Sequence, residues 1–329
     1  MSDEKKAWKV GILSVCLDAN QKDFVHYEDV YQSARDQYKL LKETYEVDFV
    51  IALTHLSIEE DRKLAEEIPD LKLIMGGHEH ENHYETVGEV PIAKADANAK
   101  SAWIHRFDYD AATDQLSVKS ELVLMNEGVT EDTAIVREVS RWEEDIFTAF
   151  QAQGIDPKAE VCALETPLDG LERNIRTQQT NLGQAIAQAM HACYPTADAA
   201  IFNGGSVRID DKLEGDITEY DILRALPFGG SVWQVKMEGS LLRKVLEMGE
   251  VNKGSGGYLQ YDRIQKVGDE WQIGGTTLVP EESYDVAISD FLMSGREKNL
   301  DFLTSENTQV GEIRKPEEGD KARDIRIAF

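Results

Sequence analysis

Three histidines stand directly after two short apolar segments with the character of buried strands. His55 follows the first segment, and His78 and His80 follow the second through Gly76-Gly77. Because ligands of an open α/β sheet bind at the carboxyl ends of its parallel strands, we expect the three imidazoles to gather at one edge of a sheet. Imidazole is a ligand for ions such as zinc, iron and nickel, and glycine lets the backbone approach closely. The pattern predicts a divalent metal site.

A plainer interpretation exists for each histidine, namely an ordinary polar residue at the end of a strand. For a single histidine that interpretation would be preferred. Two such loops, one of them with the pattern Gly-Gly-His-x-His, favour a metal site.

The segments around these loops alternate between strand and helix. Asp29 is a candidate N-cap, and Ser57-Ile58-Glu59-Glu60 has the form of a capping box. Successive strands joined by helices predict a parallel sheet with right-handed crossovers. The strands are expected at residues 8–15, 47–53, 71–75, 104–109 and 116–125, and the helices at 29–45 and 57–68.

An amphipathic segment separates this region from the rest of the chain. Its apolar residues recur at helical spacing over 131–153, before Gly154 and Pro157. From residue 158 onward the chain has helical patterns at 181–192 and 239–248 and strand patterns at 199–203, 231–237 and 284–289, enough for a core of its own. We therefore expect a first domain at 1–130, a connecting helix at 131–157 and a second domain at 158–329.

Composition narrows the classes of function. The 329 residues favour two domains, and 41% hydrophobic with 29% charged residues is typical of a globular protein. The net charge of −27 repels phosphate backbones and anionic lipids, so neither a nucleic acid nor a membrane partner is expected.

The three cysteines, Cys16, Cys162 and Cys193, are odd in number and lack CxxC spacing, which argues against a disulfide framework. The start, Met1–Lys6, shows no secretory signal, so a cytoplasmic location is expected.

A glycine-rich loop follows the expected strand at 199–203. It contains Asn203, Gly205 and Arg208, which can offer an amide, backbone N–H groups and a guanidinium to an anionic or hydroxylated ligand. Taken alone, the segment could equally be a plain turn.

Three further residues are candidates for the same ligand. Arg176 stands just before an expected helix, Phe228 follows a proline in a turn, and Phe291 follows the strand at 284–289. Each has an ordinary alternative: arginines before a helix are usually solvated, and an isolated aromatic usually belongs to the core.

Together these motifs carry a resemblance. Thr54-His55-Leu56 and Gly76-Gly77-His78-Glu79-His80 resemble the second half of the calcineurin-like metallophosphoesterase domain of the 5'-nucleotidase family. Residues 173–303 resemble the C-terminal substrate-binding domain of 5'-nucleotidases and UDP-sugar hydrolases, and the whole resemblance spans about 9–303. It implies that His55 and His78 bind one metal of a dinuclear pair, zinc, manganese or similar, and that His80 serves the other.

The resemblance also assigns the candidates of the second domain. It implies that Arg176, Asn203 and Arg208 hold the phosphate and ribose side of a nucleotide, and that Phe228 and Phe291 clamp its base. The family usually has an Asp where this chain has Glu297, and an Asn where it has Gly230.

One departure limits the chemistry that is expected. The family's domain opens with an Asp-x-His strand end, a bridging Asp and an Asn-His pair, and none precedes Lys9 here, so no catalytic residue is assigned. We expect an α/β chain, in which a partial metallophosphoesterase sheet domain precedes an α/β nucleotide-binding domain. Its expected function is metal-dependent phosphoester hydrolysis of nucleotides, impaired here and with one ion rather than two. The alternative is a non-catalytic module that binds a nucleotide or nucleoside.

Overall fold

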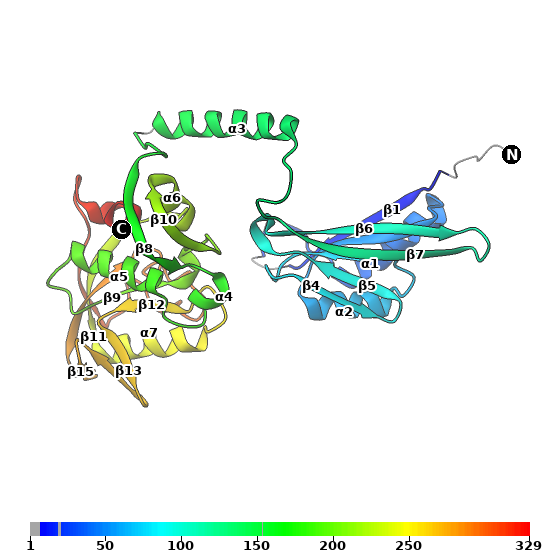
Figure 1. Ribbon diagram of the computed structural model, residues 1–329. Coiled ribbons are helices and arrows are strands. Elements are labelled where there is room, and N and C mark those ends of the chain that lie inside the picture. Colours follow the sequence, from blue (N-terminus) through cyan, green and yellow to red (C-terminus); the bar gives the residue numbers. More distant parts are fainter. Residues whose placement is uncertain (1–6, 19–20, 153) are drawn as a thin grey trace. The chain divides into compact units, whose positions relative to one another are not determined.

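The computed structural model describes residues 7–18, 21–152 and 154–329, in two compact units, Met1–Asp132 and Thr133–Phe329 (Figure 1). Met1–Lys6, for which no secretory signal is expected, and Gln153, the last residue of the amphipathic pattern, lie outside the described residues. The connecting helix itself forms as α3 (Thr133–Gln151) and belongs to the second unit. The domain boundaries at 130 and 157 stay a prediction.

A five-stranded sheet organises the first unit. In spatial order its strands are β1 (Val10–Cys16), β2 (Phe49–His55), β3 (Ile74–Gly76), β5 (Val90–Lys94) and β4 (His83–Val87), and all neighbours are parallel except β4 and β5. Asp29 and Ser57 cap the two helices as expected, and the Ser57–Glu60 capping box is complete. The elements are β1 (Val10–Cys16), α1 (Val30–Lys39) with a π-helical extension (Leu40–Thr44), β2 (Phe49–His55), α2 (Ile58–Glu67), β3 (Ile74–Gly76), β4 (His83–Val87), β5 (Val90–Lys94), a 3-10 turn (Ala97–Ala99), β6 (Ser101–Asp110) and β7 (Gln115–Leu124).

The two faces of this sheet are covered differently. The helices α1 and α2 pack on one face, where Leu13, Val50 and Ala52 belong to their core. The antiparallel β6–β7 ribbon crosses the other face and packs on Phe49 and Ile51 (Figure 1). Alternate residues of the inner strand β2 therefore serve two cores, as its nearly continuous apolar sequence predicts.

The strand β1 is the outermost strand on its side of the sheet. Burial alternates along this strand. Gly11 and Leu13 are buried on the face that the helices cover, whereas Val10 and Ile12 are exposed on the other face, and the exposed fraction of Ile12 is 58%. The β6–β7 ribbon leaves this face of β1 open to solvent among the described residues.

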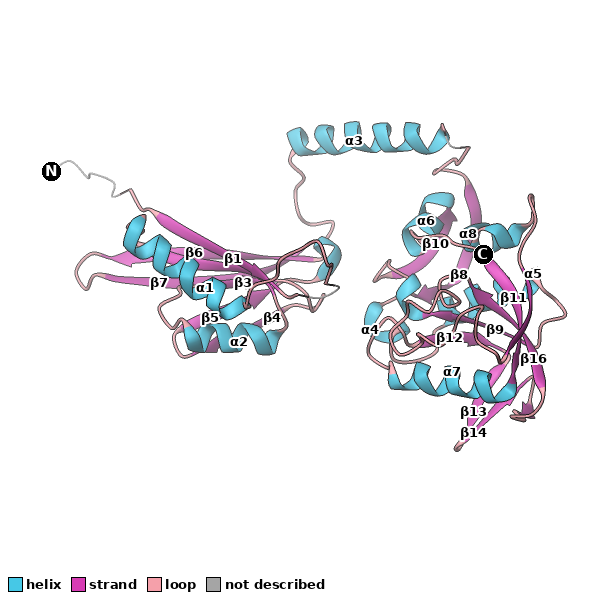
Figure 2. Ribbon diagram, turned by 180° about the vertical axis from the view of Figure 1, so that it is seen from behind, coloured by secondary structure: helices cyan, strands magenta, loops and turns pink. Residues whose placement is uncertain are grey.

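The second unit is built on a mixed sheet of order β12-β9-β16-β11-β17. Helices α5 and α8 lie against one face and α7 against the other (Figure 2). Its elements after α3 are β8 (Glu160–Asp169), α4 (Glu172–Ile175), α5 (Asn181–Cys193), β9 (Ala199–Asn203), a 3-10 turn (Gly204–Ser206), β10 (Lys212–Thr218), α6 (Glu219–Ala225), β11 (Val232–Glu238), α7 (Gly239–Val251), β12 (Leu259–Asp262), β13 (Ile264–Val267), β14 (Glu270–Ile273), β15 (Thr276–Thr277), β16 (Ser283–Ser289), β17 (Val310–Arg314), a 3-10 turn (Lys321–Arg323) and α8 (Ile325–Ala328).

The helix α3 contacts its own unit through its C-terminal turns. The rings of Phe147 and Phe150 lie 5.7 and 6.5 Å from that of Tyr220 on α6, measured between centroids. Its other apolar residues, such as Trp142, are exposed. In the described part of the chain no helix combines the length and apolar character needed to cross a bilayer.

Candidate functional site

The structure brings two of the three predicted metal ligands together. His55 is the last residue of β2, and His78 follows β3 after Gly77. Their ring centroids are 5.4 Å apart, with the planes at 75°. A Cβ added to Gly77 would lie 3.3 Å from Nδ1 of His55, so the absence of a side chain lets the loop approach this imidazole.

His80 does not complete a three-ligand arrangement. It lies two residues beyond His78. Both residues have positive backbone angles, with a φ of 88° at His78 and 63° at His80. The carbonyl oxygen of His80 accepts a hydrogen bond from the N–H of Ala97. Within residues 7–18, 21–152 and 154–329, no three His, Cys, Asp or Glu side chains are arranged to hold a metal ion. The loops thus offer a pair of imidazoles, which fits two ligand positions of an ion and leaves the others unfilled.

The second unit gathers polar groups around Arg176, which directly follows α4. Its Nη1 lies 2.5 Å from Oε1 of Glu172, and its Nε is buried without a hydrogen-bond partner. Burial lowers the pKa of Arg176, and the positive charge of Arg208 lowers it further, while the carboxylates of Glu172 and Asp210 oppose the shift. Arg176 is therefore partly desolvated, whereas Arg208 is exposed, and the unpartnered Nε of Arg176 leaves a donor for a further acceptor.

Asn203 lies at the end of β9 and is only 4% exposed. Its Nδ2 donates to Oε2 of Glu297 at 2.9 Å, and its Oδ1 accepts from the hydroxyl of Ser206 at 2.7 Å. Burial raises the pKa of Glu297, although the N–H of Lys298, the amide of Asn203 and the charge of Arg176 oppose the shift. Glu297, which the sequence marked only as a departure, is therefore part of the same cluster.

Closely packed glycines fix the position of this cluster. The N–H of Gly205 donates to the carbonyl of Gly256 at 2.8 Å, and a Cβ on Gly205 would lie 2.8 Å from Cα of Gly256. The N–H of Gly254 donates to the carbonyl of Arg176. The amide of the fully buried Gln260 donates to the carbonyl of Ile175 at 2.8 Å. The loops carrying Asn203 and Arg176 are thus joined through backbone groups.

The two candidate aromatics project from neighbouring loops. Phe228 is 71% exposed and Phe291 39% exposed, so Phe228 is not a core residue. The guanidinium carbon of Arg208 lies 5.8 Å from the centre of the Phe228 ring. The loops leave adjacent antiparallel strands, since Val232 of β11 pairs with Ser289 of β16. That the rings face each other across a cleft stays a prediction.

Most of the second unit is similar in sequence to a known domain family. Residues 160–304 match the family described as "5'-nucleotidase, C-terminal domain". Over 245 residues the chain is 31% identical to "Trifunctional nucleotide phosphoesterase protein YfkN" of Bacillus subtilis, an alignment that covers 70% of this chain and 16% of that protein. Residues 160–304 thus form a C-terminal domain of the 5'-nucleotidase family.

Other members of the 5'-nucleotidase family are more distant in sequence. The human protein named "5'-nucleotidase" is 25% identical over 283 residues, covering 74% of this chain and 48% of that protein. The crystal structure of a 5'-nucleotidase precursor from Thermus thermophilus has a TM-score of 0.73 at 20% identity, covering 97% of this chain and 68% of that one, and shows a shared fold. The chain spans about one sixth of the Bacillus relative and about half of the human one.

Proposed function

We propose that this chain binds a nucleotide through its second unit and takes part in phosphoester hydrolysis of the 5'-nucleotidase type. The observation that carries the proposal is the partly buried guanidinium group of Arg176, with the exposed Arg208 near it. Nε of Arg176 is buried without a partner, and Arg208 adds a second positive charge beside it. A phosphate group would supply acceptors to both guanidinium groups and offset their mutual repulsion.

The exposed aromatics support a nucleotide rather than free phosphate as the ligand. Phe228 presents its ring to solvent beside Arg208. A base stacked on Phe228, with Phe291 on its other face, would place the anionic end of the nucleotide at Arg176 and Arg208. Stacking is tolerant of base identity, so the arrangement favours nucleotides as a class.

A divalent ion belongs to this proposal as its cofactor. We assign His55 and His78 to the ion because the structure brings these imidazoles together, and His80 because of its place in the same loop motif. Phosphoesterases of this type use metal ions to polarise the phosphate and activate water. With two imidazoles gathered rather than a full ligand set, we expect a single ion, modest affinity and weak hydrolysis by this chain.

The test uses the full chain in two measurements. In isothermal titration calorimetry AMP should bind, adenosine more weakly and inorganic phosphate more weakly still. Phosphate release from AMP with added Mn²⁺ or Zn²⁺ should be slow or absent. Absence of AMP binding would contradict the nucleotide proposal. Rapid release that His78→Ala abolishes would show that the site is not impaired.

One observation favours the alternative of a non-catalytic nucleotide-binding module. The polar cluster of the second unit links Arg176, Asn203 and Glu297, whereas the histidine loops gather only two ligands. A module of this kind would bind AMP equally well in the chain with His55→Ala and His78→Ala and would release no phosphate with any divalent ion.

A further inference from the structure

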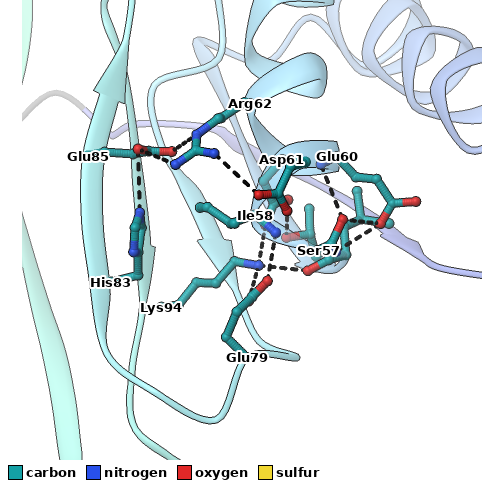
Figure 3. Close-up of polar contacts among 12 residues, drawn as sticks. Ser57, Ile58, Glu60, Asp61, Arg62, Glu79, His83, Glu85 and Lys94 are labelled. Atoms are coloured by element: carbon teal, nitrogen blue, oxygen red, sulfur yellow. Dashed lines mark hydrogen bonds and ion pairs between the residues drawn. The ribbon is translucent and has the colours of Figure 1, made fainter. Parts of the chain in front are cut away.

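A buried lysine lies beside the two histidine-bearing loops. Lys94 ends β5, and its side chain is 1% exposed. Its Nζ lies 2.6 Å from the carbonyl oxygen of Leu56, 2.5 Å from Oε2 of Glu79 and 2.8 Å from Oδ2 of Asp61 (Figure 3). The contacts with Leu56 and Glu79 are hydrogen bonds, and the contact with Asp61 is an ion pair.

Two of these oxygens adjoin the histidine pair. Leu56 directly follows His55, and Glu79 stands between His78 and His80. One buried cation therefore contacts both loops at positions next to their imidazoles. Because a buried charge is costly to leave unpaired, the ammonium group holds both loops against β5.

Glu79 adds a second tether to the loop that carries His78. Its Oε1 accepts a hydrogen bond from the N–H of Ile58 at 2.6 Å. Ile58 is the first residue of α2, whose N-terminal N–H groups have no partner within the helix and favour a negative charge. The carboxylate thus joins the loop to both α2 and Lys94. His78 has a φ of 88°, an uncommon backbone angle that surrounding contacts must maintain.

Asp61 extends the same cluster to the end of β2. It is fully buried, and its Oδ1 accepts from the hydroxyl of Thr54, the residue before His55, at 2.7 Å. A Cβ added to Gly76 would lie 2.8 Å from Cε of Lys94 and 2.9 Å from Oδ2 of Asp61. The glycine before the histidine loop therefore leaves room for the buried lysine and its carboxylates.

We propose that Lys94, acting with Glu79, is a positioning residue that sets the spacing between His55 and His78. The use of that spacing to bind a metal ion rests on the proposed function. The positioning itself is a property of the metal-free chain and is tested without any ion.

The experiment compares Lys94→Met and Glu79→Ala with wild type in the full chain. Arg62→Met is the matched control, because Arg62 also lies near the start of α2 and pairs with a carboxylate, with its Nε 2.6 Å from Oε1 of Glu85 on β4. Amide hydrogen exchange of residues 76–81 is measured without metal. Both test variants should exchange at least about tenfold faster in this loop, and Arg62→Met should match wild type. Unchanged exchange in Glu79→Ala, or an equal increase in Arg62→Met, would overturn the proposal.

A Co²⁺ titration followed by absorbance separates this inference from the metal proposal. Loss of an outer-shell partner typically weakens metal binding about 10- to 100-fold, and we expect a decrease of that size in both test variants. If wild type binds no Co²⁺ but loop exchange responds to the substitutions, the positioning role stands and the metal proposal fails. If Lys94→Met loses protection throughout the first unit, Glu79→Gln decides by the same exchange measurement. This variant keeps an oxygen acceptor for Ile58 and replaces the charged oxygen that Lys94 contacts with a neutral amide NH2 group.

Discussion

The carboxylate of Asp290 accepts hydrogen bonds from both the backbone N–H and the hydroxyl of Ser231, at 2.9 and 2.8 Å. In return, the N–H of Asp290 donates to the carbonyl of Ser231. These bonds join the turn that carries Phe228 to the loop that carries Phe291. A Cβ added to Gly230 would lie 2.8 Å from Oδ1 of Asp290, so the contact also explains why a glycine stands in this turn.

Asp290→Ala should weaken the binding of AMP and of adenosine by a similar factor. Hydrogen bonds to charged groups contribute about 1.5–3 kcal/mol, so we expect a loss of about tenfold or more as the two aromatic loops separate. Asp221→Ala is the matched control, because Asp221 accepts the same pair of bonds from Thr218 at the start of α6. Isothermal titration calorimetry on the full chain measures the affinity of both variants for AMP and for adenosine. A loss confined to AMP would assign Asp290 to the phosphate instead.

Phe228→Ala should weaken the binding of AMP by about one to two orders of magnitude, because base stacking on an aromatic ring contributes about 1–3 kcal/mol. The ring is largely exposed, so its removal should leave the thermal unfolding midpoint nearly unchanged. Trp142→Ala removes another exposed aromatic, on α3, and should have no effect on affinity. Equal affinity in wild type and Phe228→Ala would exclude the base-stacking role.

Arg208→Ala should reduce affinity for AMP about tenfold more than affinity for adenosine. Its guanidinium group contributes a charge-assisted contact to the phosphate, and adenosine lacks that group. Arg224→Ala, which removes an arginine paired with Asp221 on the surface of α6, serves as the control. Titrations at two salt concentrations add a check, since the difference between the ligands should shrink as salt rises. Parallel losses for both ligands would argue against a phosphate contact.

The raised pKa of Glu297 predicts how stability changes with pH. Burial raises this pKa above the ordinary value of 4.5, so the folded state binds the proton more tightly than the unfolded state does. The stability that Glu297 contributes is therefore fully present below pH 4.5 and is lost as the pH rises through the raised pKa. Urea unfolding across this range should show wild type losing stability relative to Glu297→Gln. A difference that grows in favour of wild type with rising pH would contradict the assignment.

The sequence was sufficient to predict the strand ends that carry His55 and His78, because buried parallel strands have continuous apolar runs and capped helices between them. It did not reveal that His80 fails to complete a three-ligand group with them in the described residues, since the loop's left-handed backbone at His78 and His80 depends on tertiary contacts. The β4–β5 hairpin was also missed, because Pro91 within a short run argues against a strand.

The polar contacts were harder to predict than the elements. Lys94 ends a wholly buried strand, and an isolated lysine after an apolar run gives no sign of the carboxylates of Asp61 and Glu79 that pair with it. In the second unit the order of the motifs marked Arg176 and Asn203 as candidates, and their roles stay a prediction. The role of Glu297 emerged only from its contact with Asn203, 94 residues away in the sequence.

The open side of β1 has a consequence for how molecules of this chain behave toward one another in solution. An outermost strand with exposed Val10 and Ile12 offers an apolar face and a strand edge, on which Gln37 bonds the backbone of Ser14, to any other strand that approaches. The net charge of −27 opposes such an approach, because like-charged molecules repel each other. Salt shortens the range of this repulsion, to about 10 Å at 0.1 M. Dilute, low-salt solutions at neutral pH should therefore keep the chain monomeric, whereas high salt or acid should promote its self-association through β1.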